Sequence, residues 1–73
     1  MANRRNDWQG LLKLANEELE KHNAEIGVYE EDGQYSITIV TDGNEEEYAG
    51  GYYEDELSAV INEAWSHALS KVK

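Results

Sequence analysis

Two Asp-Gly pairs constrain the fold of this chain more than any other feature of its sequence. Asp32-Gly33 and Asp42-Gly43 lie ten residues apart, and Asp-Gly readily adopts the positive φ angles of a two-residue β-hairpin turn. On both sides of the first pair, apolar and polar residues alternate with the period of two that is typical of β-strands. The pattern predicts a three-stranded antiparallel meander, with strands at 25–30, 34–41 and 45–49.

An amphipathic helical pattern precedes the predicted sheet. It predicts a helix at 7–23 after a frayed segment at 1–6, and Asn6 with Gln9 has the spacing of an N-cap and its capping-box partner. Six residues recur at helical spacing on one side of this helix: Trp8, Leu11, Leu12, Ala15, Leu19 and His22.

A second and longer helical pattern follows the sheet, which we expect to end at Gly50-Gly51. It predicts a helix at 54–71, with acidic residues in its first turn and basic residues in its last, where each sign is favoured by the helix dipole. Its apolar face consists of Leu57, Val60, Ile61, Ala64, Trp65, Ala68, Leu69 and Val72.

These elements predict one α+β domain over residues 1–73, in the order α-β-β-β-α. A meander with one apolar face closes most simply when both helices pack on that face. If Asp32-Gly33 forms a two-residue turn, the covered face holds two cross-strand pairs and Tyr35: Ile26 with Ile39, and Val28 with Ile37. The opposite, open face then carries Glu25, Tyr29, Ser36, Thr38 and Val40.

The facing of the third strand has two alternatives. A two-residue turn at Asp42-Gly43 places Glu45 and Glu47 on the open face and Tyr48 in the core, whereas a three-residue loop through Asn44 inverts the assignment. We favour the first alternative, because burying Tyr48 costs less than burying Glu47 without a partner.

The distribution of charge excludes several kinds of partner. The chain has 16 acidic and 6 basic residues, and the stretch between His22 and Ser70 holds twelve acids and no Lys or Arg. Such a surface repels phosphate backbones and anionic lipids, so we expect no direct binding to nucleic acid or membranes. The chain has no Cys, no apolar run long enough to span a membrane and no signal-peptide pattern after Met1. These features together predict a reducing, cytoplasmic environment.

The order and length of the elements resemble the double-stranded-RNA-binding domain. That family holds phosphates with a Lys-rich start of its second helix, whereas the corresponding segment here reads Tyr52-Tyr53-Glu54-Asp55-Glu56. The resemblance therefore implies the topology and no RNA binding.

No pattern in the sequence is typical of an enzyme, a cofactor site or a metal site. His22 and His67 lack the spacing of a metal-binding pair. The segment from Asp42 resembles the start of a calcium loop, but Glu47 stands where that loop requires Gly and Tyr53 stands at its twelfth position. No serine lies in a nucleophile elbow, and we expect neither catalysis nor a cofactor.

The acids and tyrosines instead predict a non-catalytic protein-interaction module that binds a basic surface. In its sharpest form the protein is an inhibitor that occupies the nucleic-acid-binding surface of its partner, with carboxylates imitating phosphates. In size and charge the chain resembles small phage-encoded inhibitors such as anti-CRISPR and anti-restriction proteins, which share no sequence signature. The candidate partner-binding residues are Tyr29, Glu45, Glu46, Glu47, Tyr52, Tyr53, Glu54, Asp55 and Glu56.

The alternative function is a small self-associating accessory domain. In that case the chain forms a homodimer through an exposed strand edge or the open face, and its acids serve only to keep it in solution.

Overall fold

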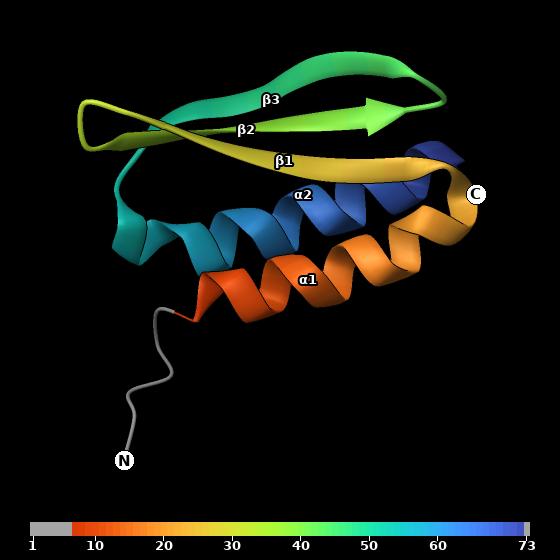
Figure 1. Cartoon of the computed structure of the whole chain (residues 1–73), viewed down its shortest axis with the longest axis horizontal. Coiled ribbons are helices and arrows are strands. Elements are labelled where there is room, and N and C mark those ends of the chain that lie inside the picture. Colours follow the sequence, from red (N-terminus) through yellow and green to blue (C-terminus); the bar gives the residue numbers. More distant parts are fainter. Residues whose placement is uncertain (1–6, 73) are drawn as a thin grey trace.

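Both Asp-Gly pairs form the turns that the sequence predicts. In the computed structural model, which describes residues 7–72, Asp32 and Gly33 have φ angles of 55° and 81°, and Asp42 and Gly43 have φ angles of 54° and 84°. Positive φ at both central residues is the signature of the tight hairpin turn that matches the twist of the flanking strands. The turns join β1 (Ala24–Glu31), β2 (Gln34–Thr41) and β3 (Asn44–Tyr52) into one antiparallel sheet in the order β1-β2-β3 (Figure 1).

Both helices lie on the same face of this sheet and contact each other (Figure 1). The first helical segment consists of α1 (Trp8–Leu19) and a 3₁₀ turn, η1 (Glu20–His22). The second consists of a 3₁₀ turn, η2 (Glu54–Glu56), and α2 (Leu57–Val72). The α+β class and the element order are thus as predicted, and the opposite face of the sheet has no helix of the described residues over it.

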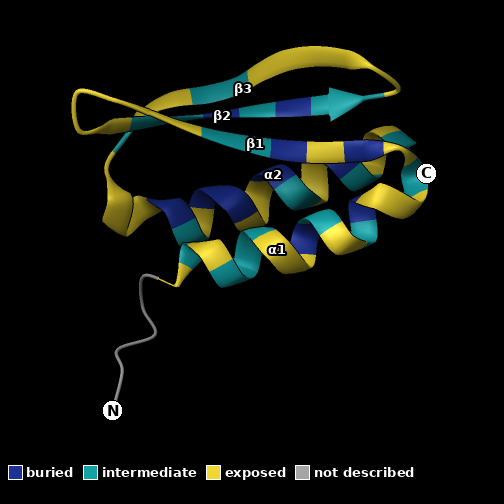
Figure 2. Ribbon diagram, viewed as in Figure 1, coloured by how far each residue is buried: buried dark blue, intermediate teal, exposed yellow. Residues whose placement is uncertain are grey.

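The core fills the space between the sheet and the two helices (Figure 2). Ile26 lies opposite Ile39 and Val28 opposite Ile37, which confirms the predicted register of the first hairpin. Among residues 7–72, eleven buried apolar residues make up the core: Ala15, Leu19, Ala24, Ile26, Ile37, Ile39, Leu57, Val60, Ile61, Ala64 and Ala68. Each helix contributes to it from the side that faces the sheet, as the periodicity requires.

The second hairpin has the two-residue turn that we favoured. Thr41 pairs with Asn44, Val40 with Glu45 and Thr38 with Glu47, so both glutamates share the open face with their partners. Tyr48 lies on the other side, where it packs against the core and its ring lies 5.1 Å from the imidazole ring of His67.

The prediction that Gly50-Gly51 ends the sheet is wrong. Strand β3 continues to Tyr52, which pairs with Tyr35, and the register shifts twice between Thr38 and Tyr35. At each shift β3 contains one more residue than β2, as in a β-bulge. Gly51 has a φ of 82°, a conformation that glycine adopts without strain, so the glycines bend the strand instead of ending it.

The helix ends also differ from the predicted bounds. Asp7 is the N-cap of α1, and its carboxylate accepts a hydrogen bond from the backbone of Gly10 at 3.3 Å. The predicted cap Asn6 and the segment 1–6 lie outside the described residues. After η1 the chain leaves the helix at Asn23, whose φ of 62° is left-handed.

Candidate functional site

The open face of the sheet points away from both helices (Figure 1). The strand register arranges its residues in rows that run across the strands. In one row Val40 lies between Glu25 and Glu45, and in the next Thr38 lies between Gly27 and Glu47. The open face comprises Glu25, Gly27, Tyr29, Ser36, Thr38, Val40, Glu45 and Glu47.

Three exposed carboxylates lie around Val40 and Thr38 on this face. Glu45 and Glu47 are two residues apart on one strand, a separation of about 7 Å along the backbone. Glu25 and Glu45 are separated by two strand spacings, or about 10 Å. The open face contains no Lys or Arg, so its three charges are not neutralised within the face.

The ring of Tyr29 lies beside Gly27 on this face. A Cβ atom on Gly27 would lie 2.8 Å from Oγ1 of Thr38 and 3.2 Å from the Tyr29 hydroxyl, so a side chain at this position would require Thr38 or the Tyr29 ring to move. The Tyr29 hydroxyl donates a hydrogen bond to Oε2 of Glu45 at 3.3 Å. With 54% of its surface exposed, Tyr29 presents an aromatic ring that is held in place beside a carboxylate.

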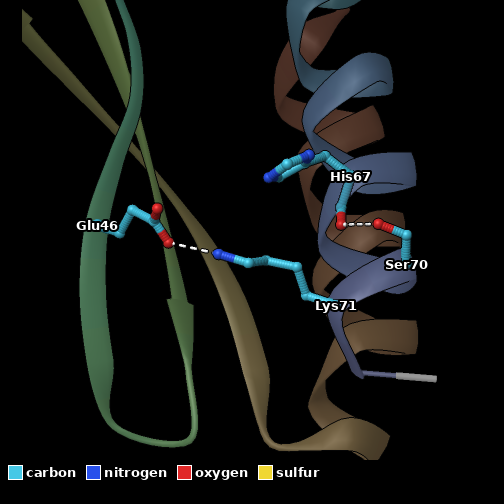
Figure 3. A network of polar contacts seen from close by, with 4 residues as sticks. All are labelled: Glu46, His67, Ser70 and Lys71. Atoms are coloured by element: carbon cyan, nitrogen blue, oxygen red, sulfur yellow. Dashed lines mark hydrogen bonds and ion pairs between the residues drawn. The ribbon is translucent and has the colours of Figure 1, made fainter.

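Glu46 lies apart from its two neighbours because it points toward the helices. Its Oε1 accepts a hydrogen bond from Nζ of Lys71 at 2.6 Å, and His67 lies one turn earlier on α2 (Figure 3). The hydrogen bond from Lys71, followed by the charge of Lys71, holds the pKa of the Glu46 carboxyl below its ordinary value of 4.5. Partial desolvation opposes this shift, and the nearby His67 adds to it. Glu46 is therefore paired within the chain.

The predicted site residues at the start of the second helix form a separate group. Tyr52 lies opposite Tyr35 at one end of β2, and Glu45 lies opposite Val40 near the other end. Five residues of strand separate these ends, or about 17 Å. Tyr52 packs against the core, whereas Tyr53 is 58% exposed.

Two acids of this second group have partners within the fold. Oε2 of Glu54 accepts a hydrogen bond from Nε1 of Trp8 at 3.1 Å, which links η2 to the start of α1. Oε1 of Glu56 accepts one from the backbone N–H of Tyr53 at 2.9 Å and closes the first turn of the helix. Tyr53 is exposed, and its hydroxyl accepts a hydrogen bond from Nε2 of Gln34 at 3.5 Å. Asp55 is also exposed. The acids and tyrosines that gather on one surface are Tyr29, Glu45 and Glu47.

Sequence reasoning placed Glu25, Thr38 and Val40 on the open face but did not count them as binding residues. The alternation of the strands was sufficient to add them, since each shares a row with a candidate residue. The sequence-based prediction did not identify Asn16 of α1, whose side-chain amide binds the backbone of Ile26. The only signal for Asn16 was a polar residue beside the apolar stripe of a helix, which is a common arrangement.

Other kinds of site have little support in the described residues. Within 7–72 no three His, Asp or Glu side chains come together as metal ligands would. His22 lines an open hollow between the helices together with Leu14, Glu17, Glu18, Lys21 and Trp65. No helix among these residues has the length and apolarity needed to cross a bilayer. Compared with known proteins, the chain matches no family model, no curated protein and no solved structure.

Proposed function

We propose that this protein is a non-catalytic module whose open face binds a basic surface of a partner protein. The observation that carries the proposal is the arrangement of Tyr29, Glu25, Glu45 and Glu47 on a sheet face with no described helix over it and no basic residue within it. In its sharpest form the module is an inhibitor, and its carboxylates occupy the positions of phosphates on a nucleic-acid-binding partner. Because the chain has no Cys, we place this activity in a reducing cytoplasm.

Electrostatics and the aromatic ring have different parts in this binding. A net charge of −10 attracts a basic partner from a distance and raises the association rate, an effect that salt screens over about 10 Å at 0.1 M. At contact, Tyr29 supplies a large and partly apolar surface that loses little conformational freedom, because its hydroxyl is already bound to Glu45.

A pair of charge-matched variants tests the proposal. The open-face variant carries Glu25→Gln, Glu45→Gln and Glu47→Gln, and the control carries Glu17→Gln, Glu18→Gln and Glu63→Gln on the helices. Each variant removes three negative charges from the net charge of −10, so the two have the same net charge and differ in where the charge is lost.

The measurement is capture of partners from a nuclease-treated lysate of the source organism, followed by stepwise elution with salt and with duplex DNA. We expect the wild type and the control to retain a basic protein that DNA displaces, and the open-face variant to lose it at lower salt. Equal loss by both variants would assign the effect to net charge, and equal retention by both would exclude the open face. Either result refutes the proposal.

A further inference from the structure

The two outer edges of the sheet differ in how their backbone groups are bonded. At the edge formed by β1, the backbone N–H of Ile26 donates to Oδ1 of Asn16 at 2.7 Å, and Nδ2 of Asn16 donates to the carbonyl of Ile26 at 3.1 Å. The amide of Asn16 thus occupies the position that a residue of a neighbouring strand would take. At the edge formed by β3, no side chain within 7–72 bonds to the backbone of Glu45 or Glu47.

The register shows which backbone groups of β3 point outward. Antiparallel partners alternate between pairs that exchange hydrogen bonds and pairs that do not. The two-residue turn makes Thr41 and Asn44 the first bonded pair, so Glu45 and Glu47 fall in non-bonded pairs. Their N–H and C=O groups therefore point away from β2. The same alternation, followed along β1 from the Asp32-Gly33 turn, places Ile26 in a non-bonded pair, so its N–H and C=O groups point outward. Asn16 binds these two groups, and this agreement supports the assignment for β3.

The charges along this edge select the strand that it can accept. An added strand places alternate side chains beside Glu45 and Glu47 on the open face, where positive charge is favoured across the strands. The intervening side chain lies beside Glu46 on the helix side, where Lys71 already neutralises the carboxylate (Figure 3). A second copy of β3 would set these acids against the same acids, which is unfavourable.

We propose that the outer edge of β3 accepts an extended segment of a partner protein as a fourth, antiparallel strand. The segment carries Lys or Arg beside Glu45 and beside Glu47, with an uncharged residue between them. It is short, because the regular part of β3 runs only from Asn44 to Glu47 before the first bulge. The inference rests on the proposed function, since it describes how a basic partner would engage the acids of the open face.

Three synthetic peptides test the inference with a defined probe. The first alternates lysine and valine over seven residues with lysine at the second, fourth and sixth positions, and the second has the same composition with its lysines adjacent. The third repeats the first with a methyl group on each lysine backbone nitrogen, which keeps the charge and removes the N–H groups that would face β3. Fluorescence polarisation of labelled peptides measures their affinities for the full chain.

We expect the alternating peptide to bind at least tenfold more tightly than the methylated one, because two or more backbone hydrogen bonds are lost. We also expect the amide protons of Glu45 and Glu47 to exchange freely in the protein alone and to become protected in the complex. Glu45→Gln with Glu47→Gln should weaken the alternating peptide about fivefold. Glu17→Gln with Glu18→Gln removes the same charge from α1 and should change the affinity less than twofold.

Equal binding of the alternating and methylated peptides, or unprotected amides at saturation, would overturn the inference. Protection that rises with protein concentration without peptide would also overturn it, since a second copy would then occupy the edge. The proposed function would survive these results if the open-face variant still lost its basic partner and the control with Glu17→Gln, Glu18→Gln and Glu63→Gln did not. The failure of the fourth strand can therefore be distinguished from the failure of the open face.

Discussion

Replacing Asn16 with alanine removes both hydrogen bonds that join α1 to the edge of β1. Each bond to the partly buried backbone of Ile26 contributes about 1 kcal/mol, so the contacts together stabilise the fold by about 2 kcal/mol. Alanine is the better helix former by roughly 0.6 kcal/mol, which leaves a net loss of about 1.5 kcal/mol. A domain of 73 residues has a total stability of roughly 4–11 kcal/mol, so the loss is a substantial part of it.

Asn62 provides a matched control for this change. It lies exposed in α2, so Asn62→Ala gains the same helix propensity and loses no contact with the sheet. We expect Asn16→Ala to be about 2 kcal/mol less stable than Asn62→Ala, equivalent to a midpoint lower by roughly 8–16 °C. Urea and thermal unfolding followed by tryptophan fluorescence measure the difference, and the urea m-value should not change.

Two results would refute this reasoning. The first is a difference between the two variants of less than about 0.5 kcal/mol, which would mean that water satisfies the Ile26 backbone equally well. The second is an unchanged exchange rate for the amide proton of Ile26 in Asn16→Ala, since that proton is donated directly to the deleted side chain. The exchange measurement is local, so it remains informative if the variant is only slightly destabilised.

Two further predictions concern β3. The lowered pKa of Glu46 means that its pairing with Lys71 stabilises the fold above the ordinary pKa of 4.5 and that this contribution is lost as the pH falls through the folded-state value. Wild type should therefore be more stable than Glu46→Gln at pH 7, and this difference should vanish in acid. Urea unfolding midpoints that differ by the same amount at pH 7 and in acid would contradict the pairing. Gly51→Ala should cost about 1 kcal/mol because its φ is 82°. Gly50→Ala should leave the thermal unfolding midpoint nearly unchanged, since only the Glu47 carboxylate at the end of a flexible side chain must move. Equal midpoints for Gly51→Ala and Gly50→Ala would argue against the bulge geometry.

Local chemistry made much of the fold predictable. The two Asp-Gly turns fix the register of both hairpins, and the register decides which side chains face the helices. For the third strand the turn allowed two facings, and the lower cost of burying Tyr48 than of burying Glu47 without a partner selected the one that the structure has. The error at Gly50-Gly51 has a physical reason, because glycine both ends strands and permits bulges. The pairing of Tyr52 with Tyr35 decides between these outcomes, and no local signal reports it.

The side-chain contacts between distant elements were not predictable from the sequence. Lys71 and Glu46 are 25 residues apart, and they pair because the last turn of α2 lies close enough to β3 for the Lys71 side chain to reach it. Asn16 reaches Ile26 only because α1 packs along β1. As a result, the sequence grouped Glu46 with its neighbours as one acidic run, whereas the fold separates it from them.

The different bonding of the two sheet edges also limits how many molecules a strand-mediated complex can contain. A sheet whose outer strands are both unpaired can add a strand at each side, and repeated addition produces a fibre. In this protein a strand approaching β1 at Ile26 would first have to displace the Asn16 amide. In the proposed complex, β3 offers one unpaired edge for each copy of the chain and would therefore take one partner strand there.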